Sequence, residues 1–142
     1  MPEMLISAEA RTVVQFYDLD PMNIVWHGNY PRFLELARGA LLDLIGYNYP
    51  EMAASGYIWP IVDMQIKYVK PARLAQTLAI RAELIEYENR IKIAYRIRDE
   101  ASGELLTKAQ TIQLCVEAET GELRLDCPPE FIAKVKALHE KP

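Results

Sequence analysis

The sequence predicts an α+β fold, in which one long helix packs against an antiparallel sheet of about five strands. Apolar residues recur at three- and four-residue spacing from residue 30 to residue 45, which is the period of an amphipathic helix. From residue 62 onward, apolar and polar residues alternate, which is typical of strands with one buried face. These two patterns, in this order, predict one helical layer and one sheet layer.

The composition excludes several classes of protein. With 142 residues, 51% hydrophobic and 25% charged, the chain is expected to form one globular domain over residues 1–142. The net charge of −4 and the lack of a basic cluster argue against nucleic acid as the main partner. Residues 1–10 lack the basic segment and apolar run of a secretory signal, and no window approaches the roughly 18 apolar residues of a membrane span. Cys115 and Cys127 have no CxxC spacing, which favours reduced thiols in a cytoplasmic protein.

The first strand and the long helix are predicted on either side of an irregular connection. The strand covers residues 9–17, which are rich in β-branched and aromatic side chains. Asn29 is expected to cap the helix N-terminus, and Pro31 falls in the first turn, where a missing N–H does no harm. Gly46 is expected to end the helix.

Four strands and a last helix are predicted in the second part of the chain. The strands cover residues 62–68, 78–84, 91–97 and 105–116. Short turns between them predict an antiparallel meander. A helical turn within residues 50–56 precedes the strands, an exposed helix over residues 130–138 follows them, and the core is expected within about residues 9–118. Because one sheet and one helix leave sheet edges uncovered, we expect a homodimer joined edge to edge, or a dimer of dimers.

The polar residues suited to chemistry lie in the connection before the long helix. Asp18 and Asp20 belong to a run of turn formers, and His27 stands just before the helix. Such a connection places polar side chains beside the unpaired N–H groups of a helix N-terminus, which suits the binding of an oxyanion. The two histidines lie far apart, so no metal site is predicted.

The segment DLDPMNIVWHGNYPRFLELAR, residues 18–38, resembles the active-site segment of hotdog-fold thioesterases, in the 4-hydroxybenzoyl-CoA thioesterase and YbgC-like acyl-CoA thioesterase branch. The positions that match are Asp18, Asp20, Ile24, Val25, Trp26, His27, Asn29 and Tyr30. The family fold, a long central helix wrapped by a curved antiparallel sheet, agrees with the predicted elements. The chain departs from the pattern at Asn23, where the family often has glycine, and at Phe16, where it often has tyrosine. Asparagine tolerates positive φ, so the turn can be kept.

The resemblance implies an acyl-CoA thioesterase that hydrolyses a thioester to free acid and CoA, with no cofactor beyond the CoA of the substrate. Asp20 takes the place of the catalytic carboxylate, as nucleophile or as general base. His27 takes the place of the residue whose backbone N–H polarises the thioester carbonyl, and its ring is a second catalytic candidate, with packing at the helix entrance as the alternative. The residues expected to contact substrate are Asn23, Val25, Trp26, Trp59 and Val62.

Other residues near the segment are assigned structural roles. Asp18 is expected to cap a turn or to pair locally, and Glu35 to pair with Arg38 one helical turn later. Lys70, Arg73, Arg90 and Lys92 are candidates for the CoA phosphates that the sequence does not separate from solvated charges.

Three alternatives to an acyl-CoA thioesterase stay open. One is a thioesterase for acyl groups on acyl carrier protein, and another is a hotdog dehydratase or hydratase with an Asp–His pair. The last is a non-catalytic hotdog protein that binds acyl-CoA or a protein partner.

Overall fold

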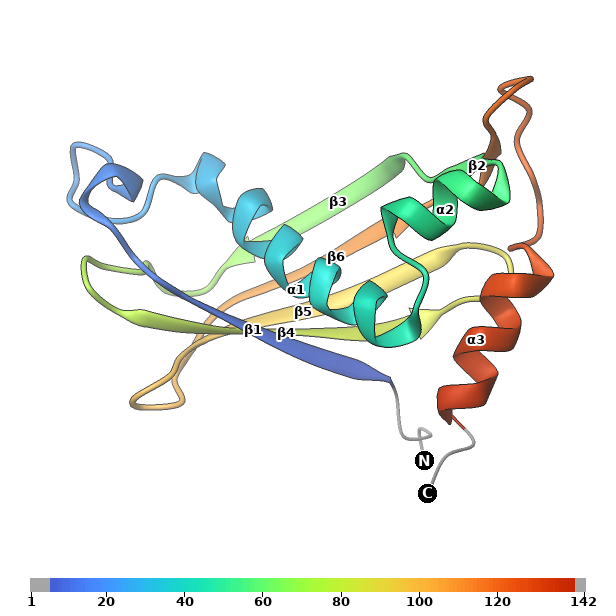
Figure 1. The fold of residues 1–142 in the computed structure, drawn as a ribbon. Helices are drawn as coiled ribbons and strands as arrows, with labels where there is room; N and C mark the ends of the chain where they lie inside the picture. The colour runs from blue at the N-terminus through green and yellow to red at the C-terminus, as the bar shows by residue number, and fades with distance from the viewer. Residues whose placement is uncertain (1–5, 140–142) are drawn as a thin grey trace.

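A five-stranded antiparallel sheet and one long helix form the two main layers of the structure, a computed structural model that describes residues 6–139 (Figure 1). The strands, in spatial order, are β1 (Ser7–Val13), β4 (Thr77–Glu86), β5 (Ile91–Asp99), β6 (Leu105–Gln113) and β3 (Ile61–Tyr68). Helix α1 (Tyr30–Ile45) lies on one face of the sheet and contacts mainly β1 and β4. The predicted α+β arrangement is confirmed.

Helix α1 has the boundaries that its sequence predicts. Its buried apolar face consists of Tyr30, Phe33, Leu34, Ala37, Leu41, Leu42 and Ile45. Gly46 ends the helix at φ 86°, and its N–H donates to the carbonyls of Leu42 (3.0 Å) and Asp43 (3.1 Å). Glycine reaches this left-handed conformation without steric cost, which is why the helix stops there.

The first strand is shorter than predicted, because the chain leaves the sheet after Val13. Val14 pairs instead with the connection between β3 and β4. The Val14 N–H donates to the Gln76 carbonyl (2.9 Å), and the Val14 carbonyl accepts the Ala75 N–H (3.0 Å). A 3-10 helix, Phe16–Asp18, then replaces the end of the expected strand. The prediction of strand over residues 14–17 is wrong.

The predicted meander is correct for β4, β5 and β6 and wrong for β3. Strand β3 pairs with β6 at the far edge of the sheet, not with β4, which follows it in the chain. The connection over residues 69–76 can cross the ~14 Å of three strand spacings, so nothing local forces β3 and β4 together. As an edge strand, β3 leaves Val62, Met64 and Tyr68 exposed, so the expected half-buried strand is also wrong in the protomer.

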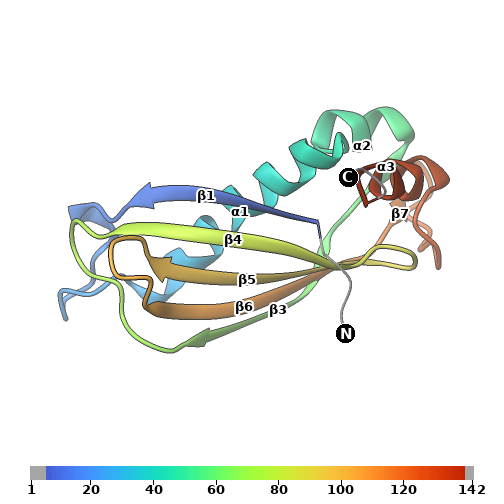
Figure 2. The same ribbon diagram turned by 90° about the horizontal axis from the view of Figure 1, so that it is seen from below.

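The remaining elements lie at the end of the molecule where α1 finishes (Figures 1 and 2). They are α2 (Tyr49–Ser55), the two-stranded pair of β2 (Tyr57–Ile58) with β7 (Val116–Glu117), and α3 (Pro129–His139). The long strand predicted to residue 116 is therefore broken after Gln113. The last helix is not exposed as predicted, because Phe131 and Val135 are buried against the core.

Among residues 6–139, no helix has the length and apolar character needed to cross a membrane. The expectation of no secretory signal concerns residues 1–10, of which residues 1–5 lie outside the described part of the chain.

Candidate functional site

A tight turn presents Asp20 at the end of the molecule where α1 begins. The Asp20 N–H donates to the Ile24 carbonyl (2.9 Å), and the Asn23 N–H donates to the Asp20 carbonyl (2.9 Å). Asn23 sits at φ 63°, so the expectation that asparagine keeps this turn is confirmed. The Met22 N–H donates to Asp20 Oδ1 (2.8 Å), whereas Oδ2 has no hydrogen-bond or ion-pair partner among residues 6–139. One carboxylate oxygen is thus fixed and the other is free to act.

Asp18 is the anchor of this turn, and its predicted structural role is confirmed. Its buried carboxylate accepts the Gln15 N–H (2.8 Å) and pairs with Arg32. Its carbonyl accepts the Trp26 N–H (2.9 Å) and the side-chain amide of Asn29 (2.8 Å). Asn29 therefore occupies the predicted N-cap position, but its side chain makes no cap hydrogen bond, because it is used to hold the loop. The predicted Glu35–Arg38 ion pair is also present.

The helix begins through a 3-10 helix, His27–Asn29, that leaves N–H donors unused. The Asn29 N–H donates to the Trp26 carbonyl (2.9 Å), and the hydroxyl of Tyr68 donates to the His27 carbonyl (3.0 Å). The N–H of His27, in contrast, has no acceptor within the described chain. A Cβ on Gly28 would lie 2.5 Å from the Trp26 indole, so the ring can lie this close to residue 28 only because that residue is glycine.

A pocket of about 230 Å³ opens between this turn, the helix entrance and strand β3. Its lining residues are Asp20, Met22, Ile24, Val25, His27, Tyr30, Tyr68 and Pro71. Asp20 is the one carboxylate of the lining, and most of the wall is aliphatic or aromatic. The rings of Tyr30 and Tyr68 pack edge to face at 5.0 Å, and burial raises the pKa of Tyr30, which keeps that phenol neutral.

Most of the residues predicted for the site meet at this pocket. Asp20, Val25 and His27 line it, Asn23 forms its turn, and the Trp26 ring lies 5.4 Å from the His27 ring. Residues of the β3 end and of the next connection, Tyr68 and Pro71, were missed. Only the pairing of β3 with β6 brings them to the helix entrance, and no local signal in the sequence encodes that pairing.

Trp59 and Val62 are not brought to this pocket. Trp59 is buried at the other end of α1, with its ring 5.8 Å from Phe131 and 6.1 Å from Tyr47. Val62 is 54% exposed at the beginning of β3. Within one protomer, neither residue lines the Asp20 pocket, and the substrate contact expected of each stays a prediction.

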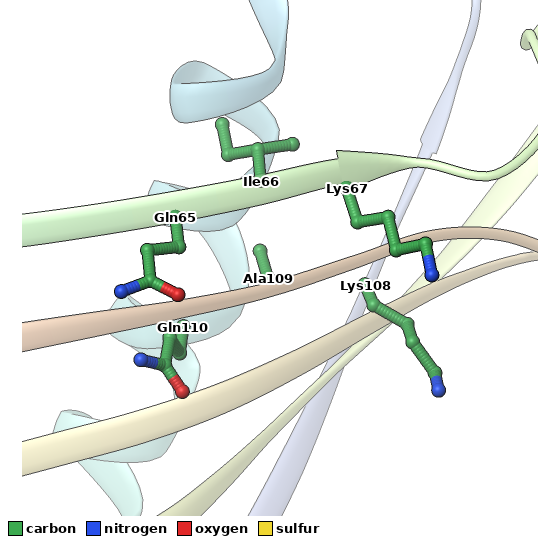
Figure 3. A pocket seen from close by; sticks show the side chains of 6 residues that line it. All are labelled: Gln65, Ile66, Lys67, Lys108, Ala109 and Gln110. Carbon is green, nitrogen blue, oxygen red and sulfur yellow. The ribbon is translucent and has the colours of Figure 1, made fainter.

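A second hollow, of about 290 Å³, lies on the opposite face of the sheet between β3 and β6 (Figure 3). In Figure 3 the side chains of Gln65, Lys67, Lys108 and Gln110 point away from α1, whereas Ile66 points toward it. Lys67 and Lys108 face each other in register, and neither has an ion-pair partner among residues 6–139. This hollow is larger than the Asp20 pocket, yet its lining contains no carboxylate and no helix N-terminus. It suits an anion better than a hydrolytic reaction.

The four cations considered for CoA phosphates differ in their pairing. Lys70 pairs with Glu104, and Arg90 and Lys92 pair with Glu86. Arg73, two residues after Pro71 of the pocket, has no ion-pair partner in the described part of the chain. Residues 6–139 also hold no cluster of three His, Cys, Asp or Glu side chains arranged for a metal ion.

Comparisons with known proteins agree with this geometry. A family model described as "Thioesterase-like superfamily" matches residues 14–135. A relative named putative acyl-CoA thioesterase YneP, from Bacillus subtilis, is 33% identical over 108 residues, which cover 75% of this chain and 78% of the relative. The acyl-CoA thioester hydrolase YbgC of Escherichia coli O157:H7 is 26% identical over 104 residues, or 73% of this chain and 78% of the relative. A solved DHNA-CoA thioesterase from Staphylococcus aureus superposes with a TM-score of 0.80 at 28% identity, covering 93% of this chain and 92% of that one.

Proposed function

The chain belongs to the thioesterase-like superfamily, and from that premise we propose that it hydrolyses acyl-CoA thioesters to free acid and CoA at the Asp20 pocket. Its architecture is the hotdog fold, with a long helix against a five-stranded antiparallel sheet. One observation carries the proposal. The free oxygen of the Asp20 carboxylate and the unpaired N–H of His27 belong to one short segment that borders a mostly apolar pocket.

The proposed reaction needs a carbonyl-polarising group and a base or nucleophile. The N–H of His27, at the positive end of the α1 dipole, receives the thioester oxygen as negative charge develops on it; such a donor is worth about 3 kcal/mol. Asp20 Oδ2 then acts in one of two ways. It attacks the carbonyl carbon, expels CoA thiolate and forms an acyl anhydride that water hydrolyses, or it takes a proton from a water that attacks directly.

The leaving group makes modest demands on the protein. A thiolate with a pKa near that of free cysteine, about 8.5, departs with little help from an acid. The His27 ring contacts the Trp26 and Tyr68 rings, at 5.4 Å and 6.5 Å between ring centres. We assign the ring mainly to shaping the pocket and the backbone of His27 to the chemistry.

CoA is proposed as the thiol carrier because the relatives are named for acyl-CoA substrates. Arg73 is the cation we assign to a CoA phosphate, since it stands near the pocket and is not engaged in an ion pair. Acyl carrier protein is the second candidate carrier, and the assay below separates the two. The two unpaired, buried cysteines fit the proposed cytoplasmic location.

A homodimer, or a dimer of dimers, is proposed as the working assembly. The support is edge strand β3, which leaves Val62, Met64 and Tyr68 exposed beside unpaired backbone groups. Pairing of two β3 edges would cover these side chains and would place Val62 within reach of a pocket shared by two protomers. Light scattering at micromolar concentration tests this, and a fully active monomer would contradict it.

The function is tested with a panel of aromatic and aliphatic acyl-CoA esters and with matching acyl groups on acyl carrier protein. Released thiol is followed with a disulfide reagent, and the protein's own thiols interfere little, because burial raises the pKa of Cys115 to about 11 and that of Cys127 to about 12. We expect multiple turnovers on at least one acyl-CoA. Turnover on carrier-protein thioesters alone would replace the CoA proposal, and binding of acyl-CoA without thiol release would replace catalysis by a binding role.

A further inference from the structure

The carbonyl of His27 lacks the hydrogen-bond donor that an α-helix would give it. In an α-helix, the carbonyl of each residue accepts the N–H of the fourth residue onward. For His27 that residue is Pro31, which has no N–H. The proline is harmless to the helix itself, but it removes this α-helical donor, so within the 3-10 helix only the Tyr30 N–H is in position for the His27 carbonyl, which stays open to a partner from outside the helix.

Tyr68 provides that partner from a distant strand. Its hydroxyl, at the end of β3, donates to the His27 carbonyl at 3.0 Å, across 41 positions of sequence. Its ring is oriented by the edge-to-face contact with Tyr30 at 85°. Tyr68 is nevertheless 47% exposed, so burial of its ring in the core does not explain this arrangement.

The bond fixes the direction of the N–H that the reaction needs. Two peptide groups flank His27, and both have their carbonyls held: that of Trp26 by the Asn29 N–H at 2.9 Å, and that of His27 by Tyr68. Because peptide groups are planar, holding both of them fixes φ and ψ of His27 and thus the direction of its own N–H. This N–H has no acceptor among residues 6–139.

We propose that Tyr68 is a positioning residue, which replaces the donor missing at Pro31 and so holds the His27 N–H in place for the thioester oxygen. The effect on catalysis rests on the proposed function, whereas the hydrogen bond between Tyr68 and His27 is present whatever the function is. Proton transfer is a different role, and the geometry does not favour it, because the hydroxyl proton of Tyr68 is directed at a carbonyl. Tyr68 therefore acts on the rate through the backbone of His27.

The test is a double-mutant cycle with Tyr68→Phe and Pro31→Ala. Tyr68→Phe removes the hydroxyl and keeps the ring, so we expect kcat to fall about tenfold, with KM changed less than about twofold and the pH profile unchanged. Pro31→Ala restores an N–H four residues after His27. Adding Pro31→Ala to Tyr68→Phe should therefore recover at least about a third of the lost kcat on a logarithmic scale. A purely structural tyrosine would not be rescued by a new amide at residue 31.

Tyr17→Phe is the matched control, because Tyr17 is also exposed near this end and its hydroxyl has no hydrogen-bond partner within residues 6–139. It should leave kcat unchanged. Parental kcat in Tyr68→Phe, or a loss in Tyr68→Phe that Pro31→Ala does not reduce at all, would overturn the proposal.

A spectroscopic arm separates this inference from the proposed function. The Gly28 N–H belongs to the same peptide group as the His27 carbonyl, so its amide resonance should shift in Tyr68→Phe and move back in the double variant, without any substrate. If these shifts occur but the parent protein has no thioesterase activity, the proposed function is refuted and the role of the hydrogen bond in holding the backbone is retained. An unshifted Gly28 resonance in Tyr68→Phe would refute the positioning role even in an active enzyme.

Discussion

The two ends of helix α1 differ in how their backbone groups are satisfied. At the C-terminal end, the Gly46 and Tyr47 N–H groups both donate to the Leu42 carbonyl (3.0 Å each), and Lys134 Nζ donates to the Gly46 carbonyl (2.7 Å). At the N-terminal end, no side chain caps the helix, and the His27 N–H has no acceptor among the described residues. We call the C-terminal end of α1 the closed end, because these backbone groups have partners, and the N-terminal end the open end, because the His27 N–H has none among the described residues. Free N–H groups at a helix N-terminus suit the binding of a ligand.

The side chains around the two ends differ in the same way. Tyr47, Trp59 and Phe131 form a buried aromatic cluster at the closed end, with ring centres 5.2 to 6.1 Å apart. Burial raises the pKa of Tyr47, which agrees with a role in packing. The open end instead holds the free oxygen of Asp20 in a pocket. We therefore expect mutations at the open end to change rate and mutations at the closed end to change stability.

The largest effect is expected for Asp20→Asn at the open end. The change is nearly isosteric and removes the charge, so kcat should fall about a thousandfold, or ~4 kcal/mol in the barrier, with parental thermal stability. Steady-state thiol release and thermal unfolding measure the two quantities. Asp43→Asn, an exposed carboxylate near the closed end, is the control and should keep parental kcat. An Asp20→Asn variant as fast as the parent would remove Asp20 from the mechanism.

The next largest effect is expected for Phe131→Ala at the closed end. Removing a fully buried ring should lower the free energy of unfolding by about 3 kcal/mol, while kcat per folded molecule stays parental. Denaturant unfolding measures the loss. Phe16→Ala is the matched control at the open end, where the ring is 82% exposed and its removal should cost less than about 0.5 kcal/mol. Equal losses for the two phenylalanines would contradict the contrast between the ends.

At the open end, the sequence predicted the turn at Asp20 and the start of α1 because their signals are local. Asp20, Asn23, Pro31 and the apolar face of α1 are turn, cap and periodicity signals that act within a few residues. The position of β3 at the sheet edge, and with it the place of Tyr68, depends on pairing between distant strands. Trp59 was assigned to the substrate pocket because it comes just before β3, the strand that borders the acyl pocket in the family that the sequence resembles. It lies in the aromatic cluster instead, because α3 folds back to cover it, and no feature near residue 59 indicates that contact.

A smaller effect on rate is expected for His27→Ala. The backbone N–H stays in place when the imidazole is removed, so the loss of kcat should be smaller than that of Asp20→Asn by at least about tenfold, or ~1.4 kcal/mol. Steady-state kinetics of both variants on one substrate decide this. Equal losses would mean that the Asp20 and His27 side chains act as a catalytic pair, contrary to the backbone role.

The smallest effect is expected for two glycines, one inside α1 and one directly after it. Gly46→Ala should destabilise the fold by about 1 kcal/mol, since φ is 86° at this position. Gly39→Ala is the matched change inside the helix, where an added Cβ meets nothing within 4 Å, and it should stabilise the fold by up to about 1 kcal/mol. Both are measured by denaturant unfolding. The same sign for the two changes would contradict the closure of the helix at Gly46.

The most direct test of the contrast between the ends is to map where a substrate-like molecule binds. A CoA thioether that carries the preferred acyl chain, and that cannot be hydrolysed, is titrated into the ¹⁵N-labelled protein while amide resonances are followed. We predict the largest shifts at residues 18–28 and at Tyr68, with those of Tyr47, Trp59 and Phe131 unchanged. The assignment of the Asp20 pocket as the active site would be contradicted by either of two results. One is that the largest shifts occur at the closed end, and the other is that they occur at Gln65 and Lys108 on the opposite face of the sheet while residues 18–28 do not shift.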